Sequence, residues 1–293
     1  MIICKTPTDL TRCLDFARQK VEKIGFVPTM GALHNGHISL IHQAKAATDY
    51  VVSSIFVNPT QFNDPKDYEK YPITLESDLL ALEMAGCDVL FLPDVATMYP
   101  EGLASTIQYE LGFLETILDG FYRPGHFQGV CRIVHKLLTL VKPTHLLLGQ
   151  KDYQQCMVIQ KMVDLTQLDV QLMICATQRE SDGLAMSSRN VRLDATNRSL
   201  APLLFQNLFQ AMTQLKPGPV KPLQTQAIAR LAQAGFRVDY FEIADAQSLK
   251  SIENWDGQQQ LVILVAAFLG DVRLIDNYTY AAYLNQLPQS IKN

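Results

Sequence analysis

The chain has 293 residues, of which 48% are hydrophobic and 18% are charged, and its formal net charge is -4. This length and composition predict one large folded domain or two ordinary ones, and they exclude a disordered chain. An acidic balance without a basic stripe argues against a nucleic-acid partner, so an anionic ligand must be bound by a local cluster of donors.

The six cysteines form no Cys-x-x-Cys pair, and most lie in apolar segments, as expected for buried side chains in a reducing compartment. The N-terminal segment lacks the basic start and the long apolar run of a signal peptide. The apolar run 261–269 is too short to cross a bilayer. We therefore expect a cytoplasmic protein with no membrane partner.

In chain order, the first half alternates short apolar runs with helix-like segments. The runs end at turn residues and predict buried strands at 24–27, 51–57, 89–92, 145–148 and 170–174. Apolar residues recur every three or four positions in the segments between them, which predicts helices at 38–47, 75–86, 130–141 and 153–165. This alternation predicts an α/β fold with a Rossmann-like, doubly wound parallel sheet, whose ligand lies at the carboxyl ends of the strands.

The character of the chain changes after about residue 176. A polar loop leads to a predicted helix at 197–215, and a Lys-Pro-Gly-Pro break follows it. Three further strands with short connections are predicted at 238–244, 261–269 and 272–275. We therefore predict a Rossmann-like domain at 1–176 and a smaller C-terminal α+β domain at 177–293.

The segment 28–37, PTMGALHNGH, is the strongest chemical signal in the chain. It lies between a predicted strand and a predicted helix, where exposed N–H groups and the helix dipole favour an anion. His34 and His37 are three residues apart, so both side chains can point from the first helical turn toward one phosphate. Imidazolium groups at that place would stabilise the negative charge that develops when a phosphate bond breaks.

Two other interpretations of this histidine pair stay open. A loop histidine is often a structural hydrogen-bonding residue. A His-x-x-His pair could also be half of a zinc site, although no convincing third or fourth ligand accompanies it.

Further polar clusters follow the later strands. In the segment 56–62, FVNPTQF, Asn58 and Gln61 offer neutral donors and acceptors for hydroxyl and carboxylate groups, although Asn58 could simply cap the end of the strand. The segment 149–155, GQKDYQQ, opens a helix and contains Lys151, a cation that could reach phosphate or could be a solvated surface residue. The segment 123–127 reads RPGHF.

The segment 179–190, RESDGLAMSSRN, combines two hydroxyls with the guanidinium of Arg189, which suits the β- and γ-phosphates of a nucleotide. The same segment could instead be a polar linker between domains. A linker that binds phosphate could close the second domain over the first.

The histidine loop resembles the His-x-Gly-His signature of the nucleotidyltransferase superfamily, which includes the class I aminoacyl-tRNA synthetases. Together with the four other segments, in this order and spacing, the chain resembles the pantothenate synthetase family from about residue 27 to residue 198, and more weakly to the end. The resemblance implies an ATP-dependent ligase that joins pantoate to β-alanine through a pantoyl adenylate. It also implies a homodimer, a requirement for Mg²⁺, and a C-terminal domain that acts as a lid.

The resemblance also implies roles for individual residues. His37 would be the proton donor, assisted by His34, with Lys151 and Arg189 completing the catalytic set. Gln61 and Gln155 would bind pantoate, with Asn58 and Arg123 as further candidates and Gln61 also beside β-alanine. Asp78 is the candidate nearest to the metal, and Asp119 is a second-rank site residue. ATP would contact Met30, Gly31, Ala32, Leu33, His34, Asn35, Gly36, His37, Gly149, Gln150, Lys151, Asp152, Gln178, Met186, Ser187, Ser188 and Arg189.

Three competing functions remain at this stage. A nucleotidyltransferase that acts on a phosphate ester would explain the histidine loop but not Asn58, Gln61 and Gln155. A tRNA synthetase would need a basic RNA-binding surface, which the acidic balance disfavours. A regulatory nucleotide-binding module would lack catalytic residues, yet His34, His37, Lys151 and Arg189 are all present.

Overall fold

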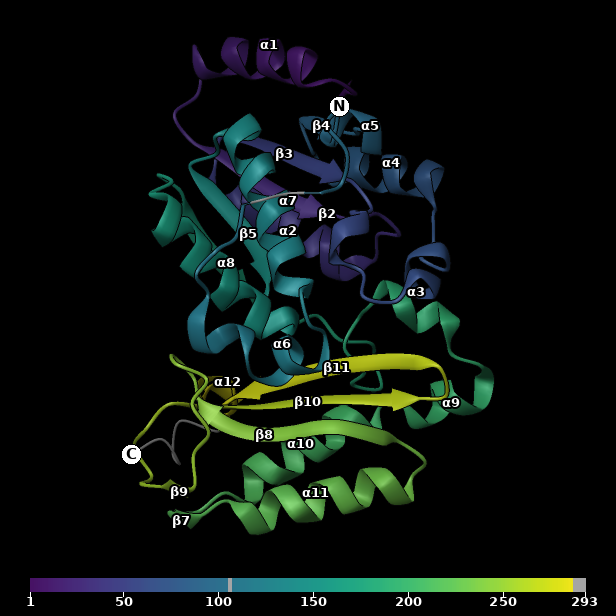
Figure 1. The fold of residues 1–293 in the computed structure, drawn as a ribbon, viewed down its shortest axis with the longest axis vertical. Helices are drawn as coiled ribbons and strands as arrows, with labels where there is room; N and C mark the ends of the chain where they lie inside the picture. Colours follow the sequence, from purple (N-terminus) through teal and green to yellow (C-terminus); the bar gives the residue numbers. More distant parts are fainter. Residues whose placement is uncertain (105–106, 287–293) are drawn as a thin grey trace. The chain divides into compact units, whose positions relative to one another are not determined.

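The computed structural model describes residues 1–104 and 107–286, and the chain divides into two compact units, one from Met1 to Gln178 and one that begins at Arg179 (Figure 1). The first unit contains a six-stranded sheet, and all of its strand pairs are parallel. The strands, in their order across the sheet, are β1 (Ile2–Cys4), β4 (Val89–Phe91), β3 (Tyr50–Ile55), β2 (Ile24–Thr29), β5 (His145–Gly149) and β6 (Gln171–Cys175).

Both faces of this sheet are covered by helices, because successive strand residues point to opposite sides and nearly all of them are apolar. On β2, Phe26 belongs to one core and Val27 to the other. The first core receives α1 (Pro7–Arg18), α7 (His126–Val141) and α8 (Tyr153–Thr166). The second core receives α2 (Asn35–Ala47) and α4 (Leu75–Met84).

The strand order reverses between β2 and β5. From β2 the chain continues to β3 and β4 on one side, and it later adds β5 and β6 on the other side. In doubly wound sheets, ligands bind outside the carboxyl ends of the strands at such a switch point. The loops that follow β2 and β5 are therefore the first place to look for a site.

Short elements connect these strands and helices. They are the 3-10 turns η1 (Pro59–Gln61), η2 (Gly112–Glu115) and η3 (Gln150–Asp152), and the short helices α3 (Pro65–Glu69), α5 (Val95–Met98) and α6 (Leu118–Tyr122). No helix in the part of the chain that the structure describes has the length and apolar character needed to cross a membrane.

The second unit is built on a three-stranded antiparallel sheet in the order β11 (Val272–Thr279), β10 (Leu261–Leu269) and β8 (Arg237–Asp245). Helices α10 (Leu203–Gln214) and α11 (Lys221–Gln233) pack with this sheet around a second hydrophobic core. The remaining elements are η4 (Ser188–Arg192), α9 (Ala195–Leu200), the β7 (Gly218–Pro219) and β9 (Asn254–Trp255) pair, and α12 (Tyr280–Gln286).

The predicted fold class is confirmed, with a doubly wound parallel sheet in the first unit and an antiparallel sheet with helices in the second. One predicted element is wrong. The helix expected at 197–215 is two helices, α9 and α10, because Pro202 between them has no N–H to donate and its ring clashes with the preceding turn. The two compact units divide after Gln178, and the domain boundary predicted after residue 176 stays a prediction.

Candidate functional site

The loop between β2 and α2 is held by one buried carboxylate. Asp78, in the first turn of α4, is 2% exposed, and its two oxygens accept the backbone N–H groups of Ala32 and Leu33, each at 2.8 Å. Asp78 Oδ1 also accepts the Thr74 hydroxyl at 2.9 Å. Gly31 lies at φ 82°, and a Cβ there would be 3.2 Å from Asp78 Oδ2, so glycine permits this close approach.

The two histidines of the loop form a capping box at the N-terminus of α2. His34 Nδ1 accepts the N–H of Gly36 at 3.1 Å, and His37 Nδ1 accepts the N–H of His34 at 3.3 Å. A ring nitrogen that accepts a hydrogen bond carries no proton, so each neutral ring has its proton on Nε2. Neither Nε2 makes a hydrogen bond within residues 1–104 and 107–286, and both N–H groups can therefore donate to a ligand.

Both imidazoles are neutral near pH 7 in the protein without ligand. Burial lowers the pKa of His34 to about 4, and the positive charge of Lys151 lowers it as well. Burial also lowers the pKa of His37 to about 3, with further contributions from His34 and Lys151. The imidazolium expected from the sequence is thus replaced by a neutral ring, which still donates a hydrogen bond through Nε2.

The backbone of this loop differs from the expected phosphate cradle. Its N–H groups are largely used inside the protein, because Asp78 and the two histidine rings accept most of them and Thr29 Oγ1 accepts another at 3.3 Å. The two imidazole Nε2–H groups remain as donors for a ligand. The engaged N–H groups belong to Gly31, Ala32, Leu33, His34, Gly36 and His37, the last of which donates to the carbonyl of His34.

Lys151 lies beside the histidines. It follows β5 in η3, its side chain is 17% exposed, and its Nζ is 3.9 Å from Asp152 Oδ1. Its charge acts on both imidazoles, so the loops after β2 and β5 bring the three groups together at the switch point. Gly149, which ends β5, and Gln150 lie in the same segment. Two sequence-predicted clusters therefore meet here.

The burial and the hydrogen bonds of Asn58 indicate a structural role. It is 1% exposed, and its Oδ1 accepts the Tyr99 hydroxyl at 2.7 Å and the Thr60 hydroxyl at 3.1 Å. Its Nδ2 donates to Gln61 Oε1 at 3.1 Å and to the carbonyl of Gly129 at 3.2 Å. These bonds favour the capping interpretation of Asn58, with Gln61 as the residue that it orients.

The two adjacent glutamines of α8 differ in their surroundings. Gln154 is 3% exposed, and its amide is bonded to the backbone of Leu114, Ile117 and Asp119 at 2.8–2.9 Å. Gln155 is half-buried, and its side-chain amide makes no hydrogen bond to any residue that the structure describes. Gln154 therefore fixes the connection between η2 and α6. The side-chain amide of Gln155 is available to bind a ligand.

Arg123 and Asp119 lie near this connection. Asp119, on α6, is 8% exposed and donates its backbone N–H to Gln154. Arg123 ends α6, and its Nη1 lies 3.1 Å from Nε2 of His126, the histidine of the RPGHF segment. His126 was not among the sequence candidates, although the motif contains it. The structure thus links Arg123 to the protein through His126.

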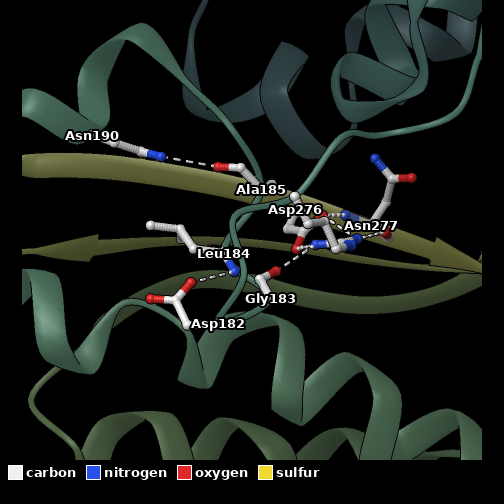
Figure 2. A network of polar contacts seen from close by, with 8 residues as sticks. Asp182, Gly183, Leu184, Ala185, Asn190, Asp276 and Asn277 are labelled. Carbon is white, nitrogen blue, oxygen red and sulfur yellow. Dashed lines mark hydrogen bonds and ion pairs between the residues drawn. The ribbon is translucent and has the colours of Figure 1, made fainter. Parts of the chain in front are cut away.

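In the second unit, Arg179 anchors the 179–190 segment to β11 through Asp276 and the carbonyl of Gly183, and both of these partners are labelled in Figure 2. Its guanidinium bonds Asp276, which is 3% exposed, at 2.6 Å and 3.1 Å, and it donates to the carbonyl of Gly183 at 3.1 Å. Figure 2 also shows Asn190 donating to the carbonyl of Ala185, at 3.0 Å. The segment is therefore a braced loop and not a loose linker.

The predicted ATP-binding residues of this segment lie around η4. Ser187 caps η4, since its Oγ accepts the N–H of Arg189 at 3.3 Å. Met186, Ser187, Ser188 and Arg189 are half-buried, and Gln178 is exposed at the end of the first unit.

The residues that the structure describes contain no group of three or more His, Cys, Asp or Glu side chains that could hold a metal ion. Asp78, the predicted metal residue, uses both oxygens on the backbone of the histidine loop. This geometry favours a positioning role for Asp78 over that of a metal ligand.

A doubly wound sheet with two imidazoles and an ammonium group at its switch point is typical of α/β enzymes that bind a phosphorylated nucleotide. The sequence model of the pantoate-β-alanine ligase family matches residues 2–279. The chain belongs to this family and is a ligase.

Individual relatives agree with this assignment. The pantothenate synthetase of Porphyromonas gingivalis is 45% identical over 282 residues, which cover 96% of this chain and 99% of that protein. The crystal structure of pantothenate synthetase from Thermus thermophilus matches with a TM-score of 0.87 at 39% identity, covering 96% of this chain and 99% of that one. Pantoate-β-alanine ligase from Francisella tularensis, complexed with β-γ ATP and β-alanine, matches with a TM-score of 0.81 at 38% identity, covering 96% and 98%.

Proposed function

We propose that the chain joins pantoate to β-alanine at the expense of ATP, with pantoyl adenylate as the intermediate. The observation that carries this proposal is the cluster of His34, His37 and Lys151 at the switch point of the sheet. Two Nε2–H donors and one ammonium group suit the α-phosphate and the leaving pyrophosphate of ATP.

In the first step, a carboxylate oxygen of pantoate forms a bond to the α-phosphorus of ATP, and the bond from that phosphorus to the bridging oxygen of pyrophosphate breaks. Negative charge grows on the non-bridging oxygens and on the leaving group. Neutral imidazoles stabilise it by donating hydrogen bonds from Nε2, and Lys151 stabilises it as a point charge.

Bound triphosphate acts on the proton affinity of these histidines. An anion beside each ring favours the protonated form, so the pKa of both imidazoles rises when ATP binds. His37 is the proton donor that the family resemblance implies, through the Nε2–H that its ring carries in both the neutral and the protonated form.

In the second step, the amine of β-alanine forms a bond to the activated carbonyl carbon, and the bond from that carbon to the oxygen of AMP breaks. The amine loses a proton, and the products are pantothenate and AMP. No protein nucleophile takes part, so catalysis depends on position and charge.

We propose the substrate roles that the family resemblance implies, and the chemistry of the side chains supports them. Gln61 and Gln155 bind pantoate through their amides, with Arg123 nearby, and Gln61 also lies beside β-alanine. Ser187, Ser188 and Arg189 of the second unit bind the phosphates of ATP, which makes that unit the candidate for the lid. Gln178 and Met186 complete the nucleotide contacts.

We propose that Mg²⁺ enters with ATP and is held mainly by phosphate oxygens, since magnesium keeps several water ligands and needs few from the protein. The proposed homodimer rests on the family resemblance alone, and light scattering of the purified protein tests it. The cytoplasm is the proposed location, in keeping with six free cysteines, five of them buried.

ATP–pyrophosphate exchange tests the proposed function. With labelled pyrophosphate, ATP and pantoate but no β-alanine, the protein should incorporate label into ATP, because the first step is reversible. Omitting pantoate should abolish the exchange. Exchange that does not depend on pantoate would point to another nucleotidyltransferase, and no exchange under any condition would indicate a binding module.

A further inference from the structure

His126 joins the N-terminus of α7 to Gln61. It is 6% exposed, and its Nδ1 lies 2.7 Å from the carbonyl oxygen of Gln61. A carbonyl only accepts, so Nδ1 carries the proton and donates it. Nε2 is then the acceptor, and it lies 3.1 Å from Nη1 of Arg123, which only donates. The two partners together fix the tautomer and the orientation of the ring.

Glycine at position 129 lets α7 lie directly against the same turn. A Cβ on Gly129 would be 2.2 Å from the carbonyl oxygen of Thr60 and 2.8 Å from Cα of Gln61. Asn58 adds a bond from its Nδ2 to the carbonyl of Gly129, at 3.2 Å. The backbone of Gln61 is therefore fixed by α7 from two directions.

The side chain of Gln61 is fixed as well. Asn58 Nδ2 donates to its Oε1 at 3.1 Å, and its Nε2 donates to the sulfur of Met30 at 3.2 Å. Met30 begins the histidine loop, so the Gln61 amide faces that loop. A thioether is a weak acceptor, and a ligand oxygen can replace it at little cost.

We propose that His126 is a positioning residue for Gln61, which holds the Gln61 amide where pantoate meets the histidine loop. This inference rests on the proposed function, in which Gln61 binds pantoate. The essential group is the Nδ1–H of His126, because the carbonyl of Gln61 accepts its hydrogen bond.

Two amide substitutions separate the two nitrogens of His126. In His126→Asn, the amide nitrogen can occupy the place of Nδ1 and donate to Gln61. In His126→Gln, the amide reaches the place of Nε2 and leaves the carbonyl of Gln61 without its donor. His42, exposed on α2, supplies matched controls as His42→Asn and His42→Gln. Steady-state kinetics of pantoate and ATP are measured for all four variants, after thermal melting shows that each is folded.

We expect His126→Gln to raise the KM for pantoate by about tenfold or more and to leave the KM for ATP within about twofold, since a loosened amide affects one substrate. His126→Asn should keep the pantoate KM within about threefold, and the His42 variants should match wild type. An unchanged pantoate KM in His126→Gln, or an equal rise for both substrates, would overturn the proposal. If His126→Gln does not fold, the folded His126→Asn variant decides. A rise of about tenfold in its KM for pantoate would also overturn the proposal.

A double variant tests whether His126 acts through Gln61. Gln61→Ala removes the side chain that His126 positions, so adding His126→Gln should change the pantoate KM no further. Additive losses would overturn the proposal. Wild-type pantoate-dependent exchange is measured first, and its absence would be a failure of the proposed function and not of the His126 assignment.

Discussion

Each histidine of the β2–α2 loop uses one ring nitrogen for the fold and leaves the other available to a ligand. The Nδ1 atoms of His34 and His37 accept backbone N–H groups, and the capping box fixes the ring orientation. The Nε2–H groups then need no proton from solvent before they donate. The structural interpretation is confirmed for the Nδ1 atoms, and the catalytic interpretation of the Nε2 atoms stays a prediction.

Replacing His37 by Ala or Asn should lower turnover by on the order of a hundredfold, because both variants lack the Nε2 donor. Asn keeps an oxygen that can accept the N–H of His34, so His37→Asn separates the donor from the cap. Single-turnover formation of AMP measures the effect, with His42→Asn as the control. Turnover like that of wild type in His37→Asn would remove Nε2 from the mechanism.

Acid should weaken folding through the same two residues. In the unfolded chain each histidine gains a proton as the pH falls through its ordinary pKa of 6.5, whereas in the folded protein the pKa is lowered to about 4 for His34 and about 3 for His37. The unfolded state therefore binds more protons between these values. The contribution of these two histidines to the free energy of unfolding is fully present above pH 6.5. It is lost as the pH falls, by up to about 1.4 kcal/mol per pH unit for each histidine.

Urea unfolding near pH 5 and near pH 7.5 measures this loss. His37→Asn has one shifted group fewer, so its unfolding free energy should fall less between the two pH values than that of wild type. An equal loss in His37→Asn and wild type would contradict the assignment.

Residue types at the site could be predicted from the sequence, but their use of individual atoms could not. Motif spacing places His34, His37 and Lys151 near one ligand. It does not reveal that Asp78, distant in sequence, takes the loop N–H groups that seemed free for phosphate. Hydrogen-bond competition of this kind depends on tertiary contacts, which periodicity does not report.

Among the elements, α4 shows how a helix can serve a neighbouring loop. Its leucine spacing predicts a buried side with Leu75, Leu79 and Leu82. Leu82 is buried and Leu79 packs against the second core, whereas Leu75 is 38% exposed and Asp78 is buried. The helix is thus rotated so that a carboxylate faces the β2–α2 loop. The apolar pattern is confirmed for Leu79 and Leu82, but it does not reveal that Asp78 is buried on the same helix and bonded to the loop.

Asp78→Asn should raise the KM for ATP by about tenfold, because one acceptor is replaced by a donor that faces backbone N–H groups. The Mg²⁺ concentration for half-maximal rate, measured at saturating ATP, should not change. Glu76→Gln, at an exposed position in the same turn, is the control. A higher Mg²⁺ requirement with an unchanged ATP KM would restore Asp78 as the metal residue.

Most of the strands and long helices could be predicted from the sequence, but the helices α1 and α11, of 12 and 13 residues, were missed, and so was the edge strand β1. The strand Leu261–Leu269 has the predicted bounds, because nine consecutive apolar residues allow no other placement. The strand Ile2–Cys4 was not predicted, since three residues carry too little pattern and its place at the sheet edge depends on pairing with β4.

Across the whole molecule, the two units depend on different stabilising contacts. The first has two apolar cores around a parallel sheet, and the second has one core and the buried Arg179–Asp276 pair, whose side chains are 18% and 1% exposed. The α/β and α+β classes follow from the order of strands and helices. The ion pair was not predictable, because its members are 97 residues apart.

Asp276→Asn should destabilise the second unit by about 3–5 kcal/mol, because it leaves a partly buried guanidinium without its charge partner. Asp182→Asn, which removes the more exposed pair with Arg198, should cost under about 1 kcal/mol. The single tryptophan, Trp255, is buried in the core of the second unit, so its fluorescence during urea unfolding reports on that unit. Equal effects of the two substitutions would contradict the assigned role of the buried pair.

The transfer of a carboxylate oxygen is the most direct test of adenylate chemistry at this site. Pantoate with ¹⁸O at both carboxylate oxygens is incubated with ATP, β-alanine and the protein, and the masses of the products are measured by mass spectrometry. Attack on the α-phosphorus predicts one ¹⁸O atom in AMP and one left in the amide of pantothenate. Label in inorganic phosphate, or unlabelled AMP beside labelled pantothenate, would contradict an acyl-adenylate intermediate.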